Sequence, residues 1–164
     1  MRSRYPEAER ALDHALHAAA LPIGAAGGLA MVARAASADP LTFCAIAVYA
    51  LALLAMLGAS AAHNRGRARA GEERRRRIDH AAIFAMIAGT YTPFTLRYLS
   101  GSLAIGVTAG IWGAALAGAA VKLCCPRRFE RLSVAVYLAL GWQGLFLLPS
   151  LFAALPKPAL TLIV

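Results

Sequence analysis

Five long stretches of this chain contain no Asp, Glu, Lys or Arg, and this feature constrains the fold more than any other. They cover residues 15–33, 41–62, 81–96, 99–121 and 132–156. A helix needs roughly 20 apolar residues to cross the hydrocarbon layer of a membrane. A chain of 164 residues cannot bury five such stretches in one water-soluble core. The sequence therefore predicts an all-α, multi-pass transmembrane helical bundle that forms a single domain over 1–164.

The positions of the predicted spans follow from these stretches and from the polar residues that flank them. The spans are placed at about 14–33, 41–62, 79–97, 99–122 and 132–155. A further apolar run, 159–164, follows a short turn that contains two prolines. Because six residues are too few to cross a membrane, we interpret this run as the start of a sixth, truncated span.

Most of the basic residues lie in the regions that the predicted spans place on one side of the membrane. The chain has 17 Lys and Arg against 8 Asp and Glu, which gives a net charge of +9. Of the 17, 14 lie in the tail before the first span and in the regions between spans two and three and between spans four and five, and 3 lie elsewhere. Lys and Arg accumulate in cytoplasmic loops, so this split predicts a cytoplasmic amino terminus in an inner (plasma) membrane.

The same basic residues bear on the partners of the chain. A net charge this positive is typical of nucleic-acid-binding proteins among soluble domains. Here the Arg clusters lie beside apolar spans, where they attract the anionic lipids of the inner leaflet, and no aromatic residues interleave with them. We therefore expect membrane lipids as partners and no nucleic acid.

Glycines and prolines in the spans predict how the helices pack. Gly106 and Gly110 have the GxxxG spacing that lets helix backbones approach closely within lipid. Pro22, Pro93 and Pro149 each interrupt a span. Proline removes a backbone donor, so we expect kinks or local breaks at these positions.

Polar and ionisable residues gather at the predicted cytoplasmic ends of the first three spans. They are His14, His17, Ser60, His63, Asp79 and His80. Ionisable residues at membrane depth are costly and usually face the interior of the bundle. Imidazole and carboxylate groups fit zinc, which takes three protein ligands and a water in catalytic sites. Histidines at helix ends also occur in the wet interface without any such role, and Asp79 would be favoured there by the helix dipole alone.

The sequence also resembles a known family. Residues 77–84 (RIDHAAIF) and 88–94 (AGTYTPF) resemble the third-helix signature of the haemolysin III family, the bacterial branch of the progestin and adiponectin receptor superfamily. Asp13 stands where that family usually has Asn. Weaker matches in the same order extend the resemblance over nearly the whole chain: Glu9, Asp13 and His17 before the first helix, 112–123 in the fourth, and 131–142 in the fifth.

This resemblance implies seven transmembrane helices, an amino terminus inside, and a zinc ion near the cytoplasmic leaflet. By motif, His63 at the end of the second span takes the role of a metal ligand. Asp79 at the start of the third takes that of the catalytic residue that holds the zinc-bound water. The family's two other ligands come from a seventh helix that this chain lacks, so the resemblance implies an incomplete site that binds zinc weakly. The substitute ligands that the chain offers are His14, His17 and His80.

Two classes of function remain from the sequence. The resemblance to the wider receptor and ceramidase group implies a zinc-dependent hydrolase that acts on a lipid amide. The alternative is a haemolysin-like cytolytic protein, or a non-enzymatic membrane protein or receptor. The second, fourth and fifth predicted spans are almost entirely apolar, which disfavours a self-contained pore. The sequence leaves the substrate and the oligomeric state open.

Overall fold

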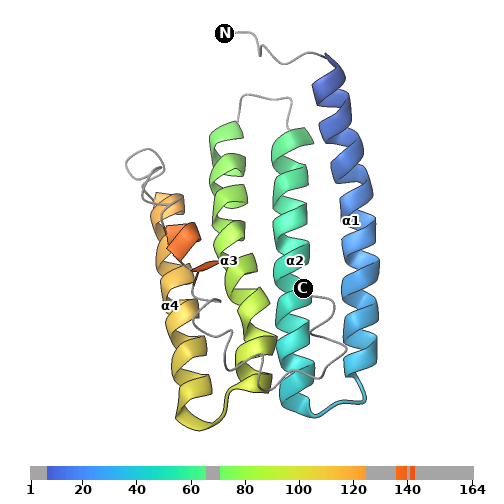
Figure 1. Cartoon of the computed structure of the whole chain (residues 1–164). Coiled ribbons are helices and arrows are strands. Elements are labelled where there is room, and N and C mark those ends of the chain that lie inside the picture. The colour runs from blue at the N-terminus through green and yellow to red at the C-terminus, as the bar shows by residue number, and fades with distance from the viewer. Residues whose placement is uncertain (1–6, 66–70, 125–135, 140, 143–164) are drawn as a thin grey trace.

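Four long helices form the described part of the molecule. A computed structural model describes residues 7–65, 71–124, 136–139 and 141–142, without the side chains of 7–11, 13, 14 and 65. The helices are α1 (Glu7–Ala35), α2 (Pro40–Arg65), α3 (Glu72–Tyr98) and α4 (Gly101–Cys124). They run antiparallel in a row, and each packs against its neighbours in chain order (Figure 1). Within these described ranges every regular element is helical.

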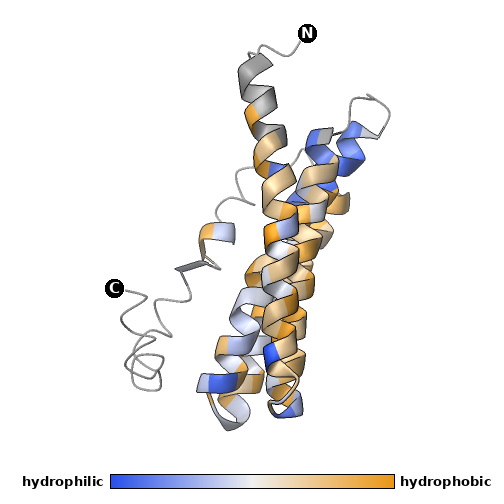
Figure 2. Cartoon of the chain, turned by 90° about the vertical axis from the view of Figure 1, so that its right-hand side faces the viewer, coloured by the Kyte–Doolittle hydropathy of each residue, from blue (hydrophilic) through white to orange (hydrophobic). Residues whose placement is uncertain are grey.

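The surface of the bundle is apolar where a soluble protein would be polar. Three helical segments are long and apolar enough to cross a membrane: Ala15–Ala35, Pro40–Asn64 and Gly101–Cys124. Large apolar side chains on them point outward, and Ile23, Leu29 and Leu51 are each about 70% exposed. Hydrophobic colour covers the helix middles, and hydrophilic colour lies at the ends (Figure 2). Lipid is the surrounding that stabilises such a surface, and the predicted all-α membrane bundle is confirmed.

The later predicted spans lie only partly within the described residues. The predicted span 79–97 lies inside α3, whose first turns also carry two Glu and four Arg. Only 136–139 and 141–142 of the predicted fifth span are described. The predicted start of a sixth span, 159–164, lies outside the described residues.

Helix α2 begins with an N-cap made by the side chain of Asp39. Asp39 precedes Pro40, and its Oδ1 accepts the backbone N–H of Thr42 at 3.0 Å, while its Oδ2 accepts the Thr42 hydroxyl at 2.6 Å. An Asp cap followed by Pro satisfies a free amide and fixes the first helical φ angle. These hydrogen bonds from Thr42 lower the pKa of Asp39. The turn between α1 and α2 is therefore defined by its own sequence.

Each pair of neighbouring helices approaches closely at a glycine. A Cβ added at Gly89 of α3 would lie 2.6 Å from the Cβ of Ala52 on α2. A Cβ at Gly24 would meet the Leu57 side chain, and one at Gly118 would meet the ring of Phe84. In lipid, where apolar burial gives little driving force, such close contact is what holds helices together.

The glycines and prolines predicted to shape the bundle behave differently. Gly106 and Gly110 have no described atom within 4 Å of an added Cβ, so the described packing does not use their GxxxG spacing. Pro22 and Pro93 lie inside helices that continue through them, without a break. Pro149 lies outside the described residues.

Hydrogen bonds between side chains join α3 to α4 within the apolar region. The hydroxyl groups of Thr95 and Thr108 lie 2.6 Å apart, and Trp112 Nε1 donates to Thr92 Oγ1 at 3.0 Å. Thr92 and Thr95 are buried, so these contacts satisfy groups that lipid could not. They fix the register of α3 against α4, and with it the position of the groups at their ends.

Candidate functional site

The predicted site residues lie at one end of the bundle. This end, which we call the polar end, contains the starts of α1 and α3 and the finishes of α2 and α4 (Figure 1). The other end, which we call the distal end, holds the turn between α1 and α2 and the turn between α3 and α4. The polar end thus collects His17, His63, Asp79 and His80 from three different helices.

Charged residues in the first turns of α3 anchor the polar end. Glu73 accepts hydrogen bonds from Arg76 at 3.3 Å and from Arg77 at 3.2 Å. These two bonds lower the pKa of the Glu73 carboxyl. Arg77 Nη1 also donates to the backbone oxygen of Leu123 at 3.3 Å. Because carbonyls in the last turn of a helix have no partner within the helix, this bond both caps α4 and ties it to α3.

A second polar contact joins α1 to α2. His17 Nε2 lies 2.9 Å from Ser60 Oγ, and the Asn64 side-chain amide donates to the same ring nitrogen at 3.0 Å. Ser60 and Asn64 lie one turn apart on α2 and so face the same way. The predicted ligand role for His17 is therefore in competition with hydrogen bonds that already hold its ring.

His63, near the end of α2, has a buried ring nitrogen whose burial is not explained by any hydrogen bond to a described residue. Its Nδ1 atom is buried and has no hydrogen-bond partner among the described residues. A buried polar nitrogen without a partner costs about 1–3 kcal/mol. Such an atom is suited to accept a proton from a substrate or water, or to bind a metal ion.

Asp79 and His80 lie in α3 near the polar end, and His80 is near groups of both α2 and α4. His80 is within electrostatic reach of His63, Asp79 and Lys122, so these groups share one region. Tyr137 donates its hydroxyl to the His80 backbone oxygen at 2.9 Å, and it lies within electrostatic reach of the Asp79 carboxylate. The Tyr137 ring packs 4.4 Å from that of Phe84, between centroids.

Lys122 is a residue of this region that the sequence pattern did not single out. It is only 4% exposed, although it ends an apolar helix. The sequence shows Lys122 as the one charge in the last turn of α4. A Lys at the cytoplasmic end of a span is also what the topology of the chain alone would explain, so the sequence gives no reason to place it in a site. Tyr137 lies in the segment 131–142 that resembles the family's fifth helix, but the sequence gave neither Tyr137 nor Asn64 a role at this site, because their roles depend on which helix faces meet.

The described side chains do not form a complete metal site. Among them, no group of three or more His, Cys, Asp or Glu could hold a metal ion. His14, one of the predicted substitute ligands, has its side chain outside the described part. His63 and Asp79 share an end of the bundle, but the other described histidines do not complete a set with them.

Comparison with known proteins agrees with this architecture. A family model described as haemolysin-III related matches residues 8–164. The chain belongs to the haemolysin III family. It is similar to a hemolysin-3 homolog of Bacillus subtilis (strain 168), with 41% identity over 86 residues, which are 52% of this chain and 40% of the relative.

A second haemolysin III relative gives a similar result. Hemolysin-3 of Bacillus cereus is 45% identical over 65 residues, which are 40% of this chain and 30% of the relative. The chain thus matches less than half of the length of either curated relative. No solved structure matches the chain. Family membership and the membrane bundle are therefore shown, while the chemistry must be argued from the polar end.

Proposed function

We propose that this haemolysin III protein acts on a membrane lipid at its polar end, and that it hydrolyses an amide bond of that lipid. The observation that carries the proposal is the buried Nδ1 of His63, which has no hydrogen-bond partner among the described residues and lies at the same end as Asp79. An ionisable pair at the edge of an otherwise apolar bundle is costly to keep without a use. The resemblance to the receptor and ceramidase group supports an amide as the bond attacked. We further propose that this end faces the cytoplasm of the inner membrane.

Asp79 has the chemistry of a general base in this proposal. Its carboxylate lies where α3 enters the apolar region, within reach of the groups around His80. A positioned carboxylate can accept the proton of a water as the water oxygen attacks the amide carbonyl. It can then give that proton to the amide nitrogen as the C–N bond breaks, which releases the fatty acid and the amine. The buried Lys122 side chain lies in the same region, where its charge acts on His80.

Zinc, which the resemblance implies, does not find a complete set of ligands among the described side chains. A catalytic zinc takes three protein ligands, and no such group is present there. In this proposal His63 holds the ion together with groups outside the described side chains, among which His14 is a candidate.

The test is the release of fatty acid from a ceramide-like amide by the purified chain in liposomes. Asp79→Asn keeps the shape of the side chain and removes the base, so turnover should fall about 100-fold or more. Glu72→Gln is the matched control, because Glu72 lies on the same helix, carries the same charge and is exposed. Full activity of Asp79→Asn would refute the role of this carboxylate.

The second candidate function is lysis of membranes, which the names of the two curated relatives favour. It predicts that the chain lyses red cells or leaks dye from liposomes without cleaving a lipid amide. Lysis should then be the same in Asp79→Asn and Glu72→Gln. That result, with no fatty acid released by any form of the chain, would replace the hydrolase proposal with the cytolytic one.

A further inference from the structure

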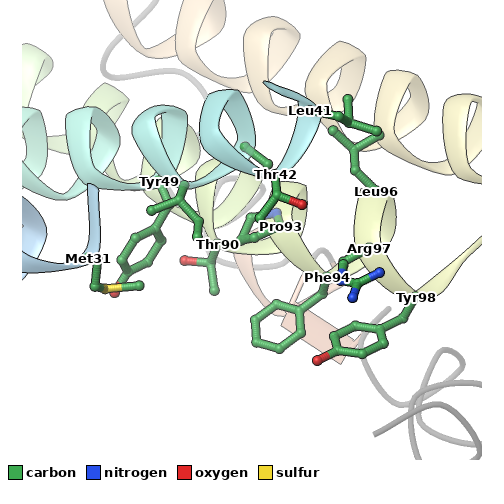
Figure 3. A pocket seen from close by; sticks show the side chains of 12 residues that line it. Met31, Leu41, Thr42, Tyr49, Thr90, Pro93, Phe94, Leu96, Arg97 and Tyr98 are labelled. Atoms are coloured by element: carbon green, nitrogen blue, oxygen red, sulfur yellow. The ribbon is translucent and has the colours of Figure 1, made fainter. Parts of the chain in front are cut away.

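A cavity of about 590 Å³ opens at the distal end of the bundle. It lies between the first turns of α2 and the last turns of α3 (Figure 3). Its wall is mainly apolar and includes Leu41, Ala45 and Ile46 of α2 and Pro93 and Phe94 of α3. Sites for small ligands usually have volumes of about 300–1,000 Å³ and walls of this kind. The cavity is large enough to hold part of a lipid.

This cavity is separate from the site at the polar end. Thr42 lines it near the start of α2, and His63 lies near the other end of the same helix. At 1.5 Å per residue, the two positions are about 30 Å apart along the helix axis. That is about the thickness of the hydrocarbon layer, so the cavity and the polar end belong to opposite membrane surfaces.

The rim of the cavity carries one basic residue, Arg97. Its side chain lies beside those of Phe94 and Tyr98 at one end of the cavity (Figure 3). The Phe94 and Tyr98 rings stack with their centroids 6.3 Å apart. Aromatic side chains with a polar tip are typical of the level of lipid headgroups. A guanidinium at this level is suited to bind phosphate through two parallel hydrogen bonds.

No acidic residue of the described part neutralises Arg97. It is exposed, and the described residues give it no ion pair. The acid of the distal end, Asp39, accepts hydrogen bonds from Thr42 with both of its carboxylate oxygens. An apolar cavity with one unpaired positive charge at its mouth matches an apolar ligand with one negative charge at its end.

We propose that this cavity binds one anionic glycerophospholipid of the surrounding membrane. An acyl chain lies against the apolar wall, and the lipid phosphate is held by Arg97. Charge complementarity selects a lipid whose headgroup carries net negative charge. The inference goes beyond the proposed hydrolysis and does not depend on it, because none of its residues lies at the polar end.

The experiment is native mass spectrometry of the full chain in detergent, titrated with phosphatidylglycerol or with phosphatidylcholine of the same acyl chains. The unmodified chain should bind one phosphatidylglycerol saturably, and more tightly than phosphatidylcholine. Arg97→Gln should weaken phosphatidylglycerol binding about fivefold, since one basic residue contributes about 1 kcal/mol to such binding, and should leave phosphatidylcholine nearly unchanged. Arg34→Gln is the matched control, because Arg34 is an exposed cation of the distal end that does not line the cavity.

A second pair of variants tests the apolar wall. Ile46→Trp fills the cavity and should weaken the binding of both lipids, whereas Leu51→Trp, on the exposed face of the same helix, should not. Equal losses in Arg97→Gln and Arg34→Gln, or unchanged binding in Ile46→Trp, would overturn the proposal. A dimer of the unmodified chain that Ile46→Trp dissociates would also overturn it, because a second copy would then occupy the cavity.

Discussion

The two ends of this bundle are built from the same four helices and differ in how those helices meet. At the polar end, neighbouring helices are joined by polar contacts, such as His17 with Ser60 and Arg77 with Leu123. At the distal end, α2 and α3 line an apolar cavity whose mouth carries Arg97, which has no ion pair among the described residues. The comparison teaches that one small bundle can hold a cluster of ionisable side chains at one end and an apolar cavity at the other.

Packing along α4 follows the same division. Gly118 lies one turn before Lys122 at the polar end and receives the ring of Phe84, which is 1% exposed. Gly106, three turns earlier toward the distal end, is exposed and has no described neighbour within 4 Å. The surface of α4 at Gly118 is therefore packed tightly against α3, whereas its surface at Gly106 is open among the described residues. Tight packing suits a site whose ionisable groups must keep their positions.

The largest effect expected from this difference is on stability. Gly118→Leu forces a side chain into the space of the Phe84 ring and should cost about 2 kcal/mol of unfolding free energy in detergent. Gly106→Leu adds a side chain to an exposed helix surface and should change stability by less than about 0.5 kcal/mol. Unfolding in increasing denaturing detergent, followed by circular dichroism, measures both. Equal costs would mean that the two halves of α4 are packed alike.

Acid is expected to have a smaller effect on the stability of the fold, and it should act in the same direction at both ends. The pKa of Asp39 at the distal end and that of Glu73 near the polar end both lie below their ordinary values of 3.8 and 4.5. Each carboxylate therefore stabilises the fold fully above its ordinary pKa, and this stabilisation is lost as the pH falls through the lowered pKa. Both side chains are solvent-exposed, so the loss should be small.

Single variants separate the contributions of Asp39 and Glu73 to the pH dependence of stability. Asn keeps the cap of α2 without a titrating group, so Asp39→Asn should make the melting temperature less sensitive to pH as the pH falls below about 4. Glu73→Gln should do the same while weakening the contacts with Arg76 and Arg77. A melting temperature that rises on acidification in the unmodified chain would contradict the direction of both pKa shifts.

The sequence predicts the fold of this protein better than its site. Apolar stretches free of charge predict an all-α membrane bundle because helix length and the thickness of the lipid layer are fixed quantities. The signature around Asp79 likewise predicts the family. The sequence does not tell that His17 meets Ser60, because this depends on which faces of α1 and α2 pack together.

For the same reason, the sequence does not predict where the helices pack most closely or where the cavity lies. The spacing of Gly106 and Gly110 predicts a packed face, but the close approaches of the described helices occur at Gly24, Gly89 and Gly118. A small residue permits close packing without saying which partner will use it. The distal cavity leaves no mark in the sequence, since its wall is made of residues from three helices that are apolar for other reasons.

The central claim is that the polar end faces the cytoplasm and the distal end faces the opposite side of the membrane. The most direct test is thiol labelling of intact cells with a membrane-impermeant maleimide, in a chain whose Cys44, Cys124 and Cys125 are replaced by Ser. Ser37→Cys and Ser100→Cys mark the two distal turns, and Glu72→Cys marks the polar end; all three positions are exposed. The account predicts labelling of the two distal positions in intact cells, and of Glu72→Cys only after permeabilisation. Labelling of Glu72→Cys in intact cells, or different results for the two distal positions, would contradict it.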